Sequence, residues 1–238
     1  MVVYTAAIRK DNPEFAEVLR RKLPLLTRAE LLGQLMKNYH TPIAVSGTHG
    51  KTTTTSMLSH VLLAAEKDPT ISVGGILKAI DGTLRVGESG FFVTEACEYP
   101  NSFLDFFPKI SIILNVEEDH MDFFKDIHDI RSSFHRFAAL LPKDGLLVIN
   151  KDIAYVETIT DGLDCKVITY SNTQDADFSA SNIAYDDFGN ASFDLIKYGT
   201  CRGRVSLSVA GEHNISNALS VIAVADMLAV KFGTDWLV

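Results

Sequence analysis

Short apolar runs alternate along this chain with longer segments in which apolar residues recur every three or four positions. The short runs predict strands at 2–7, 23–26, 42–46, 70–73, 91–94, 110–114, 146–149 and 166–170. The longer segments predict helices after Asn12-Pro13, after the capping-box sequence Thr27-Arg28-Ala29-Glu30, over 51–65, through Ile130, Phe134, Phe137 and Leu141, over 154–159, and from near His213 onwards. Continuous apolar strands separated by helices are typical of a parallel sheet covered on both faces.

The pattern changes after Tyr170. Strand-like segments at 178–185, 191–197 and 204–209 follow one another with turn signals and without helices between them. We therefore expect an α/β fold with a mostly parallel sheet, helices on both faces, and a small antiparallel sheet appended to it. A domain boundary is expected near 38–42, which separates residues 1–40 from residues 41–238.

Composition narrows the class of protein. The chain has 238 residues, 47% of them hydrophobic, and a net charge of −8 with acidic and basic residues interspersed. A nucleic-acid or anionic-membrane surface would need a basic patch, so a small-molecule protein is favoured. Three widely spaced cysteines form no CxxC pair, the first residues form no signal peptide, and the longest apolar stretch, 218–230, is too short to span a bilayer and contains Asp226. We expect a cytoplasmic protein that neither binds nucleic acid nor inserts into a membrane.

The segment IAVSGTHGKTTTTSML, residues 43–58, carries the strongest chemical signal. Gly47 and Gly50 allow a tight turn between a strand and a helix, so that backbone amides and the positive helix terminus face one ligand. Lys51 adds a charge for the β- and γ-phosphates of a nucleotide, and the Thr52 hydroxyl is placed to bind Mg²⁺. Threonine hydroxyls in a first helical turn can also bond free backbone groups. The alternative is a glycine turn with a surface lysine, and the strand and helix around the loop favour phosphate binding.

Three further segments place polar side chains after predicted strands or at a helix start. Glu95 ends a strand in TEACEYPNSFL, where a second metal-binding group would sit, although an acidic strand-end loop would look the same. His120 lies between two aspartates in ILNVEEDHMDFFKD and is either a ligand or a structural histidine. Asn214 and Asn217 share one face of the helix that opens with GEHNISNAL, where capping by Asn214 is the alternative to ligand binding.

These segments together resemble the Mur ligases, a family that joins amino acids to the peptidoglycan precursor. GTHGKTTTTS resembles the family's ATP-binding loop. The family's N-x-x-x-D-H-x-D pattern is matched by the segment with Asn115, Asp119, His120 and Asp122, and its H-N-x-x-N-A pattern is matched by HNISNA. Many members of the family have asparagine at the position of His49. Histidine at this position resembles the branch that adds L-alanine to UDP-N-acetylmuramate and the related branch of cell-wall recycling. Cys97 departs from the family, which has aspartate there, and puts fine substrate positioning in doubt.

The resemblance implies ATP and Mg²⁺ as cofactors and an acyl-phosphate mechanism. The catalytic residues it implies are Lys51, His49, Glu95 and His120, and the metal ligands are Thr52, Glu95 and His120. The cofactor-binding residues it implies are Gly47, Thr48, His49, Gly50, Lys51, Thr52, Thr53, Asn115, His213, Asn214 and Asn217, with the segment from His213 to Asn217 at the adenine.

We expect the chain to be part of a longer ligase, with UDP-N-acetylmuramate and L-alanine as the other substrates. By the resemblance, residues 1–40 correspond to the end of a UDP-binding domain and residues 41–238 to the central ATP-binding domain, without the amino-acid-binding domain. Such a part is expected to bind Mg-ATP weakly and not to ligate alanine. The alternatives are the recycling ligase, which joins murein peptides, and a nucleotide-binding module that does not ligate.

Overall fold

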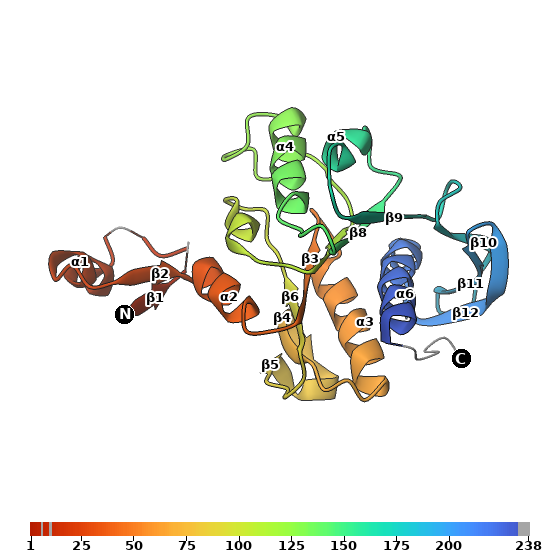
Figure 1. Ribbon diagram of the computed structural model, residues 1–238, viewed down its shortest axis with the longest axis horizontal. Coiled ribbons are helices and arrows are strands. Elements are labelled where there is room, and N and C mark those ends of the chain that lie inside the picture. Colours follow the sequence, from red (N-terminus) through yellow and green to blue (C-terminus); the bar gives the residue numbers. More distant parts are fainter. Residues whose placement is uncertain (6, 10, 233–238) are drawn as a thin grey trace.

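The computed structural model describes residues 1–5, 7–9 and 11–232, and of residues 230–232 only the backbone. Two sheets organise the described part (Figure 1). A two-stranded parallel sheet holds β1 (Val2–Tyr4) and β2 (Leu25–Thr27), and α1 (Pro13–Arg20) and α2 (Arg28–Met36) follow these strands. The predicted strand 2–7 ends earlier, and its Ala6 lies outside the described residues.

A ten-stranded sheet forms the body of the molecule, in the order β12-β11-β10-β9-β8-β7-β3-β6-β4-β5. Its strands are β3 (Thr41–Ser46), β4 (Thr70–Leu77), β5 (Gly82–Arg85), β6 (Phe91–Glu95), β7 (Ile110–Ile113), β8 (Leu146–Asn150), β9 (Lys166–Ser171), β10 (Phe178–Tyr185), β11 (Asn190–Lys197) and β12 (Thr200–Ala210). Pairing is parallel from β4 to β10 and antiparallel at both ends. The strand order reverses around β3, and in open α/β sheets ligands bind at the carboxyl ends of strands beside such a reversal.

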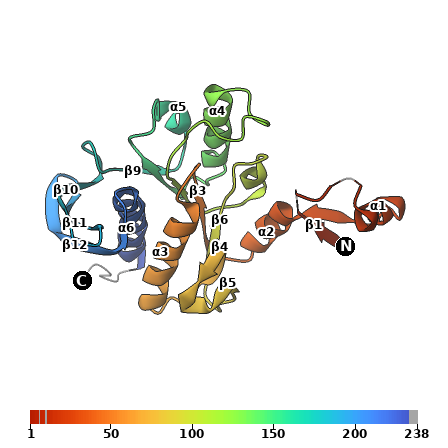
Figure 2. The ribbon, with the colours of Figure 1, turned by 180° about the vertical axis from the view of Figure 1, so that it is seen from behind.

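Helices cover both faces of this sheet. α3 (Lys51–Ala64) and α6 (His213–Phe232) lie side by side on one face, and α2, α4 (Ile127–Ala138) and the single-turn α5 (Glu157–Thr160) lie on the other (Figures 1 and 2). Two short 3₁₀ helices, η1 (Lys78–Ile80) and η2 (Ser102–Asp105), complete the fold.

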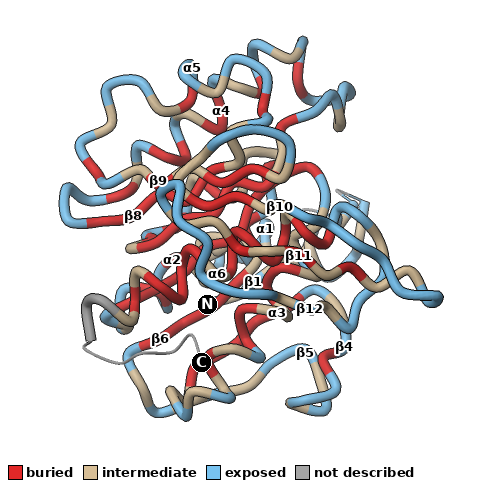
Figure 3. Tube along the Cα trace, turned by 90° about the vertical axis from the view of Figure 1, so that its right-hand side faces the viewer, coloured by how far each residue is buried: buried red, intermediate tan, exposed pale blue. Residues whose placement is uncertain are grey.

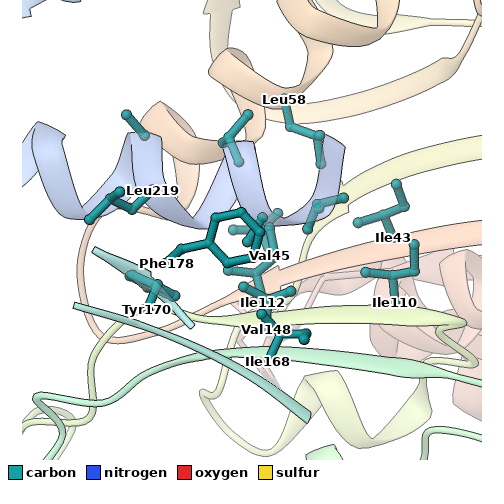
Figure 4. Close-up of a cluster of buried hydrophobic side chains, with 14 of the residues drawn as sticks. Ile43, Val45, Leu58, Ile110, Ile112, Val148, Ile168, Tyr170, Phe178 and Leu219 are labelled. Carbon is teal, nitrogen blue, oxygen red and sulfur yellow. The ribbon is translucent and has the colours of Figure 1, made fainter. Parts of the chain in front are cut away.

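The strands separate two hydrophobic cores because neighbouring residues point to opposite faces. Ile43 and Val45 of β3 pack with Leu58 of α3 and Leu219 of α6, as Figure 4 shows, whereas Ala44 packs with Phe134 of α4 on the other side. The central strands are therefore buried along most of their length, as the colouring of β6 in Figure 3 shows. The continuous apolar runs follow from this double burial.

The structure confirms the predicted fold class and differs in local detail. The antiparallel strands are not a separate sheet, because β10 pairs with β9 through Phe178–Tyr170 and Ser179–Ser171 and so extends the parallel one. The helix predicted over 154–159 begins only at Glu157. Strand β5 was not predicted from the pattern, since its four residues show no apolar alternation and owe their form to pairing with β4.

Candidate nucleotide-binding site

The predicted phosphate-binding loop connects the carboxyl end of β3 to the first turn of α3. Gly47 and Gly50 have φ values of 145° and 84°, a region that favours glycine. A side chain would also find too little room at Gly50, because a Cβ there would lie 2.9 Å from the Asn217 Oδ1. Gly50 is the N-cap of α3 and offers no side-chain hydrogen bond. No capping side chain therefore occupies the first amides of this helix, which is the arrangement that helix-terminal phosphate sites use.

The four threonines divide into two pairs. Thr52 is exposed and Thr53 is half-buried, whereas Thr54 and Thr55 are fully buried. The Oγ1 atoms of Thr54 and Thr55 have no hydrogen-bond partner among the described residues. Backbone bonding by the hydroxyls, expected from the sequence, is thus not what places this pair, and they fill the interface beneath α3 instead.

Asn115 follows β7, the strand that pairs with β3, and holds the loop from there. The His49 amide donates to the Asn115 Oδ1 at 2.7 Å, and the Asn115 Nδ2 donates back to the His49 carbonyl at 3.1 Å. The Thr48 amide donates to the Asn115 carbonyl at 3.2 Å, and the buried Thr48 hydroxyl accepts from the Glu117 amide at 3.0 Å. Thr48 and Asn115 therefore fix the shape of the loop with their side chains, while the His49 side chain is exposed.

Lys51 forms an ion pair with Glu98 at the centre of the site. Its Nζ lies 3.1 Å from the Glu98 Oε2 and donates to the Gly47 carbonyl at 2.5 Å. The Glu98 side chain is only 3% exposed and that of Lys51 18%. The other Glu98 oxygen lies 3.9 Å from the His120 Nε2. One buried carboxylate thus connects the loop lysine to the histidine of the third motif.

His120 has a left-handed backbone conformation, with φ at 53°. Its ring packs on Tyr99 at 4.6 Å between centroids, and its Nδ1 lies 3.9 Å from an Asp119 oxygen, too far for a hydrogen bond. The Tyr99 hydroxyl donates to the Asp122 Oδ2 at 3.1 Å, a bond that raises the pKa of Tyr99. The Asp119 carboxylate therefore lies near the imidazole without a direct hydrogen bond to the ring.

Thr52 and Glu95 both adjoin the glycine pair Gly74-Gly75 within β4. The Gly74 amide donates to the Glu95 Oε1 at 2.5 Å, and a Cβ at Gly75 would lie 3.2 Å from the Thr52 Cγ2. The described residues contain no ready-made cluster of three or more His, Cys, Asp or Glu. A hydroxyl and a carboxylate nevertheless fit Mg²⁺, which takes one or two protein oxygens together with substrate phosphates and waters.

The predicted adenine segment reaches the loop from α6. Asn214 and Asn217 are buried, and their side chains are engaged with the protein: Asn214 donates to the Ala210 carbonyl at 2.8 Å, and Asn217 donates to the Asn214 Oδ1 at 3.0 Å. Asn214 lies inside α6 and is not its N-cap. His213 is exposed. The structure therefore brings Asn217 against Gly50 and leaves His213 as the member of this segment that faces solvent.

Two features of the site were not predicted from the sequence. Glu98 is visible in the EACE segment, but nothing local marks it as the partner of Lys51, 47 positions away. The glycine pair Gly74-Gly75 is visible as an interruption of an apolar strand, a signal for close approach of another group.

A second concavity of about 510 Å³ lies beside the site, between the first 40 residues and the segment after β6. Arg28 of α2 and Arg136 of α4 line it together with Glu95, Cys97 and Tyr99. Desolvation raises the pKa of the Cys97 thiol. The groove also contains the Asp105 carboxylate, so it places two guanidinium groups and two carboxylates next to the predicted metal site.

Comparisons with known proteins find matches to most of this chain. The model of the Mur ligase middle domain matches residues 45–225, and that of the Mur ligase family catalytic domain matches residues 1–40. The chain is 56% identical over 230 residues to a UDP-N-acetylmuramate–L-alanine ligase of Agathobacter rectalis and 55% identical over 231 residues to that of Lachnospira eligens. These alignments cover 97% of this chain, which spans about half the length of both curated relatives.

Solved structures show the same likeness. A UDP-N-acetylmuramate–alanine ligase of Thermotoga maritima superposes with a TM-score of 0.83 at 28% identity, over 96% of this chain and 51% of that one. A UDP-N-acetylmuramate:L-alanyl-γ-D-glutamyl-meso-diaminopimelate ligase of Neisseria meningitides gives a TM-score of 0.83 at 31% identity, over 95% of this chain and 74% of that one. Within the described residues no helix is long and apolar enough to cross a membrane.

Proposed function

Because this chain belongs to the Mur ligase family, we propose that it binds ATP and Mg²⁺ at the loop Gly47–Gly50 as part of a ligase that joins L-alanine to UDP-N-acetylmuramate. In this proposal residues 1–40 belong to the end of a UDP-binding domain and residues 41–238 to the ATP-binding domain, whose residues 233–238 lie outside the described ones. The observation that carries the proposal is the uncapped N-terminus of α3 directly behind the loop, with the Lys51 ammonium folded over the loop carbonyls.

In the first chemical step, the muramate carboxylate attacks the γ-phosphorus of ATP, the bond to the bridging oxygen breaks, and ADP leaves. The loop amides and Lys51 hold the phosphates in line and offset their negative charge. Thr52 and Glu95 would hold one Mg²⁺ and His120 a second, and these ions would supply additional charge neutralisation. The resulting acyl-phosphate is attacked by the amine of the amino acid, which expels phosphate and forms the amide.

Lys51 exchanges partners in this scheme. Without nucleotide its ammonium is paired with Glu98, so phosphate oxygens and the Glu98 carboxylate compete for the same donor. His49 in the phosphate loop and His213 in the expected adenine segment have exposed side chains, and Thr53 adds a half-buried hydroxyl in the first turn of α3. The groove lined by Arg28 and Arg136 is suited to the anionic acyl acceptor.

The recycling ligase is the second candidate, favoured by the likeness to the Neisseria protein, of which this chain covers 74%. The names of the Agathobacter and Neisseria relatives both contain UDP-N-acetylmuramate, so in this proposal the step at the phosphate loop is common to both candidates. They differ in the amine that is added, a single alanine or a tripeptide.

The test joins this chain to the remaining half of the Agathobacter relative, in place of the segment to which it is 56% identical. We expect phosphate release from ATP that requires UDP-N-acetylmuramate and L-alanine together, measured with the Lys51→Met variant as the matched control. A hybrid that folds and binds the nucleotide but forms no acyl-phosphate with UDP-N-acetylmuramate would support the non-ligating module instead.

A further inference from the structure

The glycine pair Gly74-Gly75 interrupts a buried strand at the place where β4 passes the candidate metal site. β4 pairs with β6 from Thr70 to Ser72 only. Glycine inside a strand weakens it, and its usual justification is an unusual backbone angle or close approach of another group. Neither Gly74 nor Gly75 has a positive φ, so the backbone angle does not require glycine here. The lack of room for a side chain must therefore be the reason for glycine at these two positions.

The space at Gly74 is occupied by the Glu95 carboxylate. A Cβ at this position would lie 2.8 Å from the Glu95 Oε2 and 3.0 Å from its Oε1. The amide of Gly74 donates to the same Oε1 at 2.5 Å, where a continued ladder would have bonded to the backbone of β6. The missing side chain thus lets a backbone donor hold the carboxylate directly.

The space at Gly75 is occupied by Thr52. A Cβ there would lie 3.2 Å from the Thr52 Cγ2, tighter than ordinary contact. Two adjacent residues of one strand therefore adjoin the two oxygen-bearing side chains that the proposed function assigns to Mg²⁺. One of these side chains comes from β6 and the other from α3, so β4 is the element that adjoins both.

We infer that Gly74 and Gly75 are positioning residues, which set the Glu95 carboxylate and the Thr52 hydroxyl at the spacing that Mg²⁺-nucleotide requires. This inference rests on the proposed nucleotide function. The expected role is specific to the metal, because neither glycine belongs to the loop that holds the phosphates. An added methyl at Gly74 meets the far end of a flexible side chain, so the fold accommodates it by moving the carboxylate away.

The experiment compares the unchanged chain with Gly74→Ala and Gly82→Ala. Gly82 lies in the paired strand β5, and a Cβ there has only the Ile80 carbonyl oxygen within reach, at 3.9 Å. Calorimetry measures binding of the β,γ-imido analogue of ATP, first in EDTA and then over a series of Mg²⁺ concentrations. Thermal unfolding of each variant verifies that it is folded.

We expect Gly74→Ala to raise the half-saturating Mg²⁺ concentration about tenfold, the usual size of effect when an outer-shell partner of a metal ligand is disturbed. Its affinity in EDTA should remain that of the unchanged chain, and Gly82→Ala should match the unchanged chain in both conditions. An unaltered Mg²⁺ dependence in Gly74→Ala would overturn the inference, as would an equal loss with and without metal. No binding by the unchanged chain would overturn the proposed function itself, and the inference with it.

A second measurement does not depend on a variant. In the nucleotide complex of the unchanged chain, addition of Mg²⁺ should shift the amide resonances of Gly74 and Gly75 in a nitrogen–proton correlation spectrum and leave that of Gly82 in place. This result would support the inference if Gly74→Ala failed to fold. Amide resonances of Gly74 and Gly75 that do not shift when Mg²⁺ is added would overturn it.

Discussion

At the residue scale, the contact between Lys51 and Glu98 combines function with stability. The Glu98 carboxylate is almost fully buried, and the Lys51 ammonium is the cation that offsets its charge. Removal of one member of a buried pair leaves an uncompensated charge, which costs far more than the pair contributes when intact. In the proposed function, a nucleotide that draws Lys51 away leaves Glu98 without its cation, and His120, whose Nε2 lies 3.9 Å from the Glu98 Oε1, is the neighbouring polar group.

We predict that Lys51→Met lowers the free energy of unfolding by about 1–3 kcal/mol, since the partly exposed lysine makes the penalty smaller than for a fully buried pair. Methionine keeps an unbranched side chain that lacks the ammonium group, so the loss is mainly electrostatic. Urea denaturation in the absence of nucleotide measures it.

The matched control is Lys51→Met combined with Glu98→Gln, which removes both charges. This double variant should regain most of the lost stability while its nucleotide affinity stays low. If the double variant were less stable than Lys51→Met, the ion pair would not be the cause.

At the scale of elements, α2 and η2 meet at a position where only glycine fits. A Cβ at Gly33 would lie 1.9 Å from the backbone oxygen of Asp105, which cannot rotate away. Alanine normally improves a helix over glycine by about 1 kcal/mol, whereas overpacking against backbone costs about 1–3 kcal/mol. Because the steric cost is the larger of the two, the change in the free energy of unfolding should be destabilising.

Gly33→Ala is accordingly predicted to destabilise the protein by up to about 2 kcal/mol, in spite of its better helix propensity. Gln34→Ala is the control, because Gln34 is the exposed neighbour on the same helix. Chemical denaturation of the two variants measures the difference. A Gly33→Ala variant as stable as the original chain would mean that α2 packs on η2 less closely than the structure has it.

At the scale of the whole molecule, burial is concentrated in the ten-stranded sheet and its helices. Among the described residues up to Leu32, none is buried, and α1 has no buried residue at all. Figures 1 and 2 show β1, β2 and α1 projecting from the sheet that carries the site. A segment with few buried apolar contacts opens at low free energy, independently of the core.

We expect the amides of β1, β2 and α1 to exchange with solvent much faster than those of β3, β6 and β7, when followed by hydrogen exchange and mass spectrometry. Strands β11 and β12, which form the antiparallel end of the same sheet, serve as an internal comparison of exposed strand backbone. Equal protection of β1 and β3 would show that the first 40 residues are stabilised by contacts that the structure does not contain.

The sequence by itself determined the elements and the loop. Residue spacing is enough to predict the central strands, the helix behind Gly50, the Asn12 cap and the Thr27 capping box, because these depend on neighbours within a few positions. Lys51 and the two loop glycines were predictable for the same reason. The sequence did not predict β5, or the antiparallel end as a continuation of the main sheet, since both depend on pairing with strands that the local pattern does not specify.

Only the tertiary structure decided how the motifs combine into a site. Asn115 reaches His49 across 66 positions, Glu98 reaches Lys51 across 47, and Gly74 meets Glu95 across 21. These contacts arise from the order of β4, β6, β3 and β7 in the sheet, which places their carboxyl ends side by side. Strand order is set by the packing of the whole chain, so spacing along the sequence identified the polar groups, and the fold decided which of them touch.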